Sequence, residues 1–445
     1  MPAADPPSDP SADRPSGPER APADRAEGAH ARPPGERPLD VLFLCPWLPW
    51  PLDSGGKLRT FNLIHAVRPW ARVHLRAVLE PDQGQAEVDA LAPHCASLRA
   101  FPRERAGALM RLTHSKMERW FHSPALVAAV RQELLETDYD VVHVDELLHA
   151  RILPRPEELT GAPRRRPPVV QHHHKLDTVF AQRVNAHRGL QKHFDAWKLH
   201  RLERESAGRH EHHLLCSPGD AEILRGRYPD IRCSVVPSGY DPDYFHPPAD
   251  PPPRDEAHLV FVGSMDYGPN IDALTDFVAR VLPKLLERRP DLRLSIVGRN
   301  PVPEVRALAS DHVMVTGGVP DVRPWLTHAT AMVVPLRIGG GTRLKIAEAM
   351  AMDCPVVSTT IGAEGLGLEH GGELLLADDT RAMVEACLGL VEDPAAAAAM
   401  AGRARAFIEE HLTWPKLAER LAGVWRSVAG EAGDGSPGPA GPASA

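Results

Sequence analysis

The sequence predicts an α/β fold built from two successive doubly wound domains. Short apolar runs rich in Val and Leu alternate with helical segments along most of the 445 residues, which is the pattern of parallel sheets covered on both faces. The alternation pauses at 246–257 (HPPADPPPRDEA), a polar, proline-rich stretch typical of a linker. It then restarts, so one unit precedes this stretch and another follows it.

Apolar runs define the expected strands of each unit. In the first unit they are 41–47, 72–79, 97–101, 140–145, 167–173, 213–218 and 233–238. In the second they are 258–264, 292–298, 313–318, 331–336, 354–360 and 372–377. Helical patterns include 61–67, 271–289, 395–412 and 414–428. We therefore expect an N-terminal domain at 39–245, the linker at 246–257 and a C-terminal domain at 258–411. The sequence leaves open whether the helix at 412–429 packs on the second domain or crosses back to the first.

The two ends of the chain differ from the rest in composition. Residues 1–38 contain ten prolines and no Val, Ile, Leu, Phe, Tyr or Trp. Such a segment buries too little apolar surface to offset its ordering entropy. We expect disordered tails at 1–38 and, for the same reason, at 430–445.

Charge and cysteine content exclude several classes of protein. The chain has 51 Lys and Arg against 59 Asp and Glu, a net charge of −8, so nucleic-acid binding through bulk charge is not expected. Its six cysteines are far apart, without C-x-x-C spacing, which argues against a disulfide framework or zinc cluster. Neither a membrane-span pattern nor a signal pattern is found. The expected location is the cytoplasm.

The most informative motif is the segment 333–357, in which a buried strand leads into a glycine loop and a helix starting near position 342. A loop without side chains exposes backbone N–H groups and the positive end of a helix dipole. Two cations would suit a diphosphate, and a carboxylate one turn later would suit ribose hydroxyls. The alternative is a plain glycine turn with an exposed Lys–Glu pair. The candidate donor-binding residues here are Gly339, Gly340, Gly341, Arg343, Lys345 and Glu348.

Two further strand-to-helix loops are candidates. Ser54, Gly55 and Gly56 follow the first strand, where glycine lets the backbone approach a ligand closely, and Lys57 and Arg59 could add charge. The alternative is a tight turn with solvated cations. Ser264 ends the first strand of the second unit, and Asn270 is either a ligand or only a helix N-cap.

Three adjacent histidines end the strand at 167–173. A histidine can exchange protons near neutral pH or hydrogen-bond a sugar hydroxyl. Because side chains alternate along a strand, we select His173 first and His174 second as catalytic candidates. A metal-binding trio and purely structural histidines are the alternatives. Asp145 and Glu146 also follow a strand and could face an acceptor.

These motifs resemble the nucleotide-sugar site of the retaining glycosyltransferase family 4, whose GT-B fold has two Rossmann-like domains facing a central cleft. The resemblance extends over most of residues 40–427 and includes VVPSGYDPDYF (235–245) and FVGSMDYGPNIDAL (261–274). It implies that the loops after 47 and 264 lie near the donor, that a histidine after strand 167–173 contacts the donor sugar, and that Glu348 binds the ribose. The family often has a second glutamate eight positions earlier, where this chain has Gly340.

The predicted function is transfer of a sugar from a UDP- or GDP-sugar, UDP being favoured, to an acceptor hydroxyl, with retention and without metal or other cofactor. The closest resemblance is to bacterial exopolysaccharide and cell-envelope sugar transferases. The acceptor is a glycan, a lipid-linked sugar or a small molecule. A UDP-sugar 2-epimerase and a non-catalytic nucleotide-sugar-binding scaffold are the alternatives. The basic and aromatic stretch 103–121 either contacts an anionic membrane or forms an ordinary amphipathic surface helix.

Overall fold

The computed structural model describes residues 36–155, 166–185 and 190–434, and side chains in 183–193 and 431–434 are not described. Two parallel sheets, one of seven strands and one of six, form the centres of two domains. The predicted α/β class is therefore confirmed, and each of the expected strands overlaps a strand of the structure.

The first sheet has the order β3-β2-β1-β4-β5-β6-β7. Its strands are β1 (Leu39–Cys45), β2 (Ala71–Val78), β3 (Ser97–Phe101), β4 (Val141–Asp145), β5 (Val169–His173), β6 (His212–Leu215) and β7 (Cys233–Val235). The second sheet has the order β10-β9-β8-β11-β12-β13. Its strands are β8 (His258–Val262), β9 (Arg293–Val297), β10 (Val313–Gly317), β11 (Ala331–Val334), β12 (Val356–Ser358) and β13 (Leu375–Leu376).

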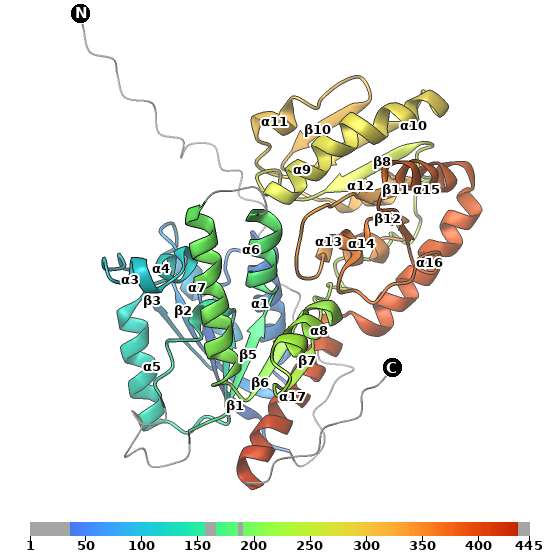
Figure 1. Ribbon diagram of the computed structural model, residues 1–445. Helices are drawn as coiled ribbons and strands as arrows, with labels where there is room; N and C mark the ends of the chain where they lie inside the picture. The colour runs from blue at the N-terminus through green and yellow to red at the C-terminus, as the bar shows by residue number, and fades with distance from the viewer. Residues whose placement is uncertain (1–35, 156–165, 186–189, 435–445) are drawn as a thin grey trace, which may run out of the picture.

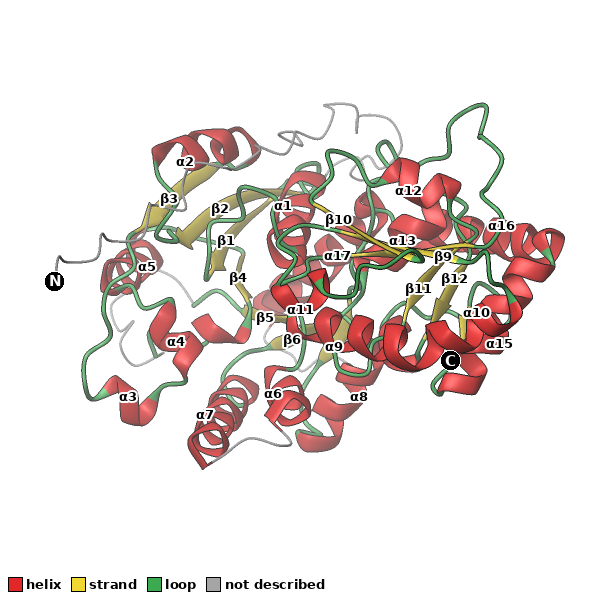
Figure 2. Ribbon diagram, turned by 90° about the horizontal axis from the view of Figure 1, so that it is seen from above, coloured by secondary structure: helices red, strands yellow, loops and turns green. Residues whose placement is uncertain are grey.

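Helices cover both sheets, as Figure 2 shows. Those of the first domain are α1 (Gly55–Ala66), α2 (Gln85–Leu91), η2 (Ala92–His94), α3 (Met110–Thr113), α4 (Lys116–Trp120), α5 (Pro124–Glu136), η3 (Leu147–His149), α6 (Asp177–Asn185), α7 (Leu190–Ala207) and α8 (Pro218–Arg227). Those that follow are α9 (Gly268–Asp276), η5 (Phe277–Val281), α10 (Leu282–Arg288), α11 (Pro303–Arg306), α12 (Arg323–His328), α13 (Leu344–Ala351), α14 (Thr360–Ala363), α15 (Thr380–Glu392), α16 (Pro394–His411) and α17 (Trp414–Asp434).

The single helix expected at 271–289 is interrupted. It divides into α9, a π-helical turn at η5 and α10. Pro283 lies at the start of α10, where its ring and missing N–H disturb the preceding turn of a continuous helix.

In both sheets the strand order reverses beside the first strand, between β1 and β4 and between β8 and β11. The loops after these strands therefore lie at the two switch points, which is where doubly wound sheets bind ligands. β1 is buried along nearly its whole length, as expected for a central strand covered on both faces.

The last helix crosses back to the first domain. Trp414, Leu417, Leu421 and Trp425 of α17 share a buried core with β1, β2 and α1, and Figure 1 shows this helix, in red, lying against the first domain. This packing resolves the alternative that the sequence left open. The helix also extends to Asp434, so the prediction that a disordered tail starts at residue 430 is wrong for residues 430–434. The helix continues because the packing of its preceding turns favours adding further residues to it. Residues 1–35 and 435–445 of the expected tails lie outside the described part of the chain.

The switch-point loop after β11 contacts the first domain beyond the ends of β6 and β7. The Thr342 hydroxyl donates to the carbonyl oxygen of Cys216 at 2.9 Å and accepts from the N–H of Ser238 at 3.3 Å. Leu344, at the start of α13, packs against the core of the first domain. Among the described helices, none has both the length and the apolar character that crossing a bilayer requires.

Candidate functional site

The glycine loop between β11 and α13 lies directly against the first domain. Gly341 has φ +72°, a conformation that glycine adopts without strain. A Cβ on Gly341 would also collide with the carbonyl oxygen of His174. A Cβ on Gly340 would lie 3.4 Å from Cβ of Lys175. The loop therefore needs glycine because it approaches the end of β5 so closely.

Arg343 holds this loop together. It occupies the N-cap position of α13, so the helix starts at Leu344 rather than near 342 as expected. One guanidinium nitrogen, Nη1, donates to the carbonyl oxygens of Gly340 and Gly341, each at 2.5 Å. In this conformation Arg343, a predicted donor to the diphosphate, is bonded to protein carbonyl oxygens. Its guanidinium would have to exchange those bonds to bind an anion.

Lys345 connects α13 to the loop after β8. Its Nζ lies 3.2 Å from Oδ1 of Asn270 and 4.1 Å from the centre of the Phe261 ring. Burial, with a smaller contribution from Arg343, lowers the pKa of Lys345 to about 7, while Glu348 acts in the opposite direction. Desolvation of an ammonium beside a helix start is typical of a group prepared to receive an anion.

Ser264 and Asn270 are engaged within the same loop. The Ser264 hydroxyl donates to Asp266 at 2.6 Å, and the Asn270 side-chain amide donates to the Ser264 carbonyl oxygen at 2.8 Å. Helix α9 begins at Gly268 after Tyr267 as N-cap, so the expectation that Asn270 is an N-cap is wrong. Asn270 instead links Ser264 to Lys345.

Ser54, Gly55 and Gly56 lie at the opposite side of the domain contact. The Ser54 hydroxyl caps α1 by accepting from the N–H of Lys57 at 3.4 Å. A Cβ on Gly55 would lie 3.6 Å from the Leu344 side chain, and one on Gly56 would lie 3.8 Å from Nδ1 of His174. The structure thus brings this loop together with α13 and the end of β5.

The cations after this loop are not available to a ligand. The Lys57 ammonium pairs with Glu80 at 2.6 Å. Arg59 is buried and donates to the carbonyl oxygens of Val236 and Pro237, each at 2.6 Å. The suggestion that they add charge to the site is therefore wrong: Arg59 fixes the chain that leads from the first domain into the linker.

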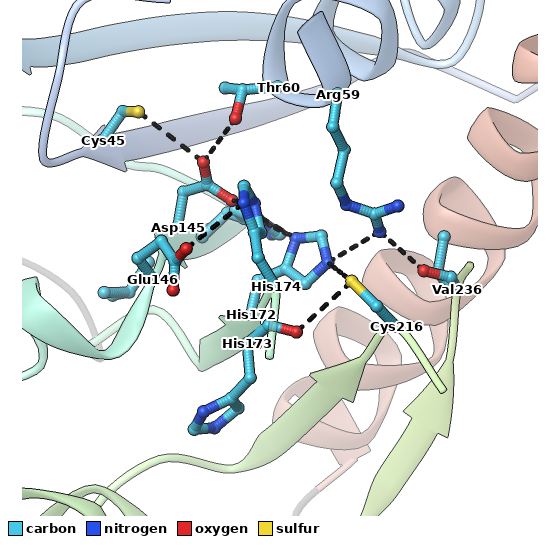
Figure 3. A network of polar contacts seen from close by, with 12 residues as sticks. Cys45, Arg59, Thr60, Asp145, Glu146, His172, His173, His174, Cys216 and Val236 are labelled. Carbon is cyan, nitrogen blue, oxygen red and sulfur yellow. Dashed lines mark hydrogen bonds and ion pairs between the residues drawn. The ribbon is translucent and has the colours of Figure 1, made fainter. Parts of the chain in front are cut away.

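Asp145, the last residue of β4, forms the centre of a buried polar network (Figure 3). Its Oδ1 lies 2.8 Å from Nε2 of His174 and 3.4 Å from Nδ1 of His172, and its Oδ2 accepts from Thr60 at 2.7 Å. Burial by itself would raise the pKa of Asp145. The charge of His174 and hydrogen bonds from the surrounding histidines outweigh it and hold this pKa well below its usual range.

Two outer hydrogen bonds assign the tautomers of this network. Trp425 donates to Nδ1 of His143 at 3.2 Å, and Arg59 donates to Nε2 of His172 at 2.9 Å. Each neutral imidazole then carries its proton on the other ring nitrogen, which is Nε2 in His143 and Nδ1 in His172. These two nitrogens lie 3.3 Å from each other, and 3.9 Å and 3.4 Å from Oδ1 of Asp145. His143, Asp145 and His172 are close enough together to suggest metal ligands, but a ring nitrogen that carries a proton has no lone pair for a metal ion.

His173 does not belong to this network. Figure 3 shows its ring pointing away from Asp145, and its Nε2 lies 3.1 Å from Nδ1 of His213. Burial lowers the pKa of His173 to about 3. Alternation along β5 puts His172 and His174 on the Asp145 side, so the first choice of His173 is wrong and the second, His174, is the one at the site.

The sequence analysis gives too little weight to the charged residues that immediately follow β4 and β5. Glu146 Oε1 lies 3.3 Å from Nδ1 of His174, and the Lys175 ammonium lies 3.8 Å from the same oxygen and 3.1 Å from Asp177. Burial lowers the pKa of Lys175, but Asp177 and Glu146 outweigh this and raise it. The signal was present, because charged residues directly after two neighbouring parallel strands meet at one sheet edge.

Two family models match the chain. Residues 82–244 match "Glycosyltransferase Family 4", and residues 256–393 match "Glycosyl transferases group 1". The chain is 30% identical over 208 residues to a phosphatidyl-myo-inositol mannosyltransferase of Mycolicibacterium smegmatis, covering 44% of this chain and 52% of that protein. It is 25% identical over 412 residues to the protein of the same name from Mycobacterium tuberculosis, covering 88% and 98%. The chain spans about half the length of several of the curated relatives that it matches.

Solved structures share the fold. A sucrose-phosphate synthase from Thermosynechococcus elongatus superposes with a TM-score of 0.66 at 18% identity, covering 88% of this chain and 99% of that one. Anabaena HepE in complex with UDP and glucose superposes with a TM-score of 0.61 at 17% identity, covering 87% and 100%. With matches to glycosyltransferase models in both domains and two facing parallel sheets, the chain belongs to glycosyltransferase family 4 and has the GT-B fold.

Proposed function

We propose that this protein transfers a sugar from a nucleotide diphosphate sugar to an acceptor hydroxyl. One observation supports this most: the glycine loop of the second domain approaches His174 and Lys175 of the first, and Leu344 at the start of α13 approaches Gly55. A diphosphate at the loop and a sugar beside His174 would then lie at adjoining positions. A plain glycine turn would not need to approach another domain so closely.

In this proposal the second domain binds the leaving group. Backbone N–H groups of the loop, Arg343 and Lys345 stabilise the diphosphate as the anomeric bond breaks, which is electrostatic stabilisation by preorganised donors. Lys345 is desolvated and half protonated near neutral pH, so an arriving diphosphate would raise its pKa and complete its protonation. Glu348, one turn further along α13, would bind the ribose.

The first domain orients the reacting sugar. Asp145 accepts from Nε2 of His174 and so fixes the ring with its Nδ1 directed at the Gly56 and Glu146 side. Asp145 is thus a positioning residue, and His174 is the group that contacts the sugar. We further propose retention of anomeric configuration, as the family resemblance implies, and a reaction without metal, since the protein's own cations neutralise the diphosphate.

The donor is proposed to be a UDP-sugar, with a GDP-sugar as the second candidate. Anabaena HepE is described with UDP and glucose, whereas several curated relatives are named mannosyltransferases, two of them GDP-mannose-dependent. The test is to incubate the full chain with UDP-glucose and GDP-mannose and with candidate acceptors, and to identify products by mass spectrometry. A new glycoside supports the proposal. Interconverted sugar nucleotides would favour an epimerase, and binding without turnover would favour a scaffold.

We also propose that the first domain contacts an anionic membrane, the location at which a lipid-linked acceptor would be met. Six of the nine large hydrophobic side chains that are exposed in the described residues lie on two neighbouring segments. We call them the α3–α7 surface: Leu109, Leu112, Met117, Trp120, Phe194 and Trp197.

Hydrogen bonds hold these segments side by side. The backbone N–H of Lys116 donates to Asp195 at 3.2 Å, and the Lys198 ammonium donates to the carbonyl oxygen of Arg111 at 2.7 Å. Figures 1 and 2 both show α3, α4 and α7 along the same edge. Arg103 stacks on the Trp120 ring at 3.9 Å. Aromatic side chains mixed with cations, in a protein whose net charge is −8, suit anionic headgroups.

A further inference from the structure

Glu146 is held in a conformation that a glutamate adopts only under strain. It follows β4 directly and has φ 68° and ψ 145°, a region occupied almost solely by glycine. The conformation is fixed because its N–H donates to the carbonyl oxygen of His172 at 2.9 Å. A glutamate that persists at such a position indicates that its side chain does something a glycine could not.

The carboxylate of Glu146 is buried but only half satisfied. The side chain is 4% exposed. Its Oε1 lies 3.3 Å from Nδ1 of His174 and 3.8 Å from the ammonium of Lys175. Its Oε2 has no hydrogen-bond partner among the described residues. A buried carboxylate oxygen without a donor is costly, and this cost disappears when a ligand supplies a hydroxyl.

The neighbours of Glu146 show which part of the site lies nearest to its carboxylate. The two residues beside the Glu146 carboxylate, His174 and Lys175, are those that the glycine loop approaches from the second domain. Gly56, at the start of α1, borders His174 from a third direction. The unpartnered oxygen therefore belongs to the same junction of three loops that the proposed function assigns to the donor.

Gly340 of the second domain also lies at this junction. Its Cα faces the side chains of Lys175 and Phe180, and an added Cβ would already lie 3.4 Å from Cβ of Lys175. A glutamate at 340 would therefore begin in van der Waals contact with Lys175, whose ammonium pairs with Glu146 and Asp177. The carboxylates that pair with Lys175 at this junction come from the first domain.

We propose that Oε2 of Glu146 accepts a hydrogen bond from a hydroxyl of the donor's sugar and thereby discriminates a nucleotide sugar from the bare nucleotide diphosphate. This inference rests on the proposed function, because it requires a nucleotide sugar at the junction. The chemistry is complementary: a sugar offers several O–H donors, and the carboxylate oxygen lacks one.

The experiment measures affinity rather than turnover. Isothermal titration of the full chain with UDP, UDP-glucose, GDP and GDP-mannose gives the ratio of diphosphate Kd to sugar-nucleotide Kd. For Glu146→Gly we expect this ratio to fall at least tenfold, while the Kd of the diphosphate changes less than twofold. Glu146→Gln should give an intermediate fall. Asp177→Asn, which removes the other carboxylate beside Lys175, is the matched control and should leave the ratio unchanged.

Thermal unfolding separates this role from a structural one. Glycine suits φ 68°, so Glu146→Gly should unfold at the same temperature as the wild type or a few degrees higher; a structural glutamate would give a lower value. An unchanged affinity ratio, or a fall seen only in Asp177→Asn, overturns the inference while leaving the proposed function intact. An unchanged ratio with a raised acceptor KM would assign Glu146 to the acceptor and equally overturn it. A wild-type chain that binds none of the four nucleotides overturns both proposals.

Discussion

The two halves of the site are built by different means. The half in the second domain is local in sequence: a loop, a helix start and two cations lie within residues 339–348. The half in the first domain is assembled from the ends of β1, β4 and β5 and from α1, with Asp145 at its centre. The first kind of site binds through backbone and flexible cations, and the second fixes a buried carboxylate through several strands.

This difference has a consequence for tolerance to mutation. A loop that binds through backbone N–H groups loses affinity gradually when one cation is removed. The buried Asp145 carboxylate has hydrogen bonds to three side chains, Cys45, Thr60 and His174. Such a network is cooperative, because each partner is left unsatisfied when the anion is lost. We therefore expect substitutions in the first-domain half to have larger effects than those in the second-domain half. The first-domain substitutions should lower kcat rather than weaken nucleotide binding.

Substitution of Asp145 should have the largest effect. Asp145→Asn removes the buried anion that His174 and Thr60 contact, which should lower the free energy of unfolding by about 3–5 kcal/mol. Below the unfolding transition, kcat should fall at least about a hundredfold, while the Kd of the nucleotide diphosphate changes little. Urea unfolding, turnover and titration calorimetry measure the three quantities.

Thr60→Val is the control for Asp145. It removes one hydrogen bond to Oδ2 and leaves the His174 contact at Oδ1 intact, so kcat should change only a few fold. If Thr60→Val and Asp145→Asn reduce kcat equally, Asp145 is merely part of the core and does not position His174.

Removal of the cations of the second domain should come next. Lys345→Ala and Arg343→Ala should each weaken binding of the nucleotide diphosphate by about 1.5–3 kcal/mol, the range for a hydrogen bond to a charged group. Lys284→Ala, an exposed lysine on α10, is the control and should bind like the wild type. Calorimetry that gives equal affinity for all of these variants would show that the diphosphate is bound elsewhere.

The same contrast between local and assembled features decides what could be predicted from sequence. The strands of the two parallel sheets are encoded in contiguous residues, and the structure contains a strand at each expected position. The segment 339–348 is likewise contiguous, but its helix begins at Leu344 rather than near 342. His173 was preferred over His174 because the face of β5 that meets Asp145 depends on register with β4, which a single strand does not reveal. The sequence suggests that Arg59 is a solvated cation. Its hydrogen-bond partners, Val236 and Pro237, lie more than 170 residues away in the sequence, in the segment that leads into the linker.

The pH dependence of nucleotide binding should sharpen the role of Lys345. Burial lowers its pKa to about 7 in the free protein, and a bound diphosphate favours the charged form and raises this pKa. Binding above pH 7 must then take up a proton, so the affinity should be constant below pH 7 and fall by up to about tenfold per pH unit above it. Lys345→Arg, which stays charged, should remove this dependence; a wild-type affinity that is flat from pH 6 to 9 would contradict it.

The smallest expected effect concerns the α3–α7 surface, which belongs to the first domain but lies outside its buried network. Arg111 and Lys116 are exposed on this surface, and each cation near an anionic bilayer contributes about 1 kcal/mol. The double variant Arg111→Ala/Lys116→Ala should therefore partition about 30-fold less onto vesicles of phosphatidylglycerol and phosphatidylcholine, measured by co-sedimentation at low salt. Lys284→Ala/Arg381→Ala removes two exposed cations of the second domain and should sediment like the wild type. Equal partitioning of both double variants would mean that bulk charge, not this surface, contacts the membrane. Reduced partitioning of Arg111→Ala/Lys116→Ala alone would assign the surface to membrane binding. In that case catalysis on a water-soluble acceptor should be unchanged in this variant.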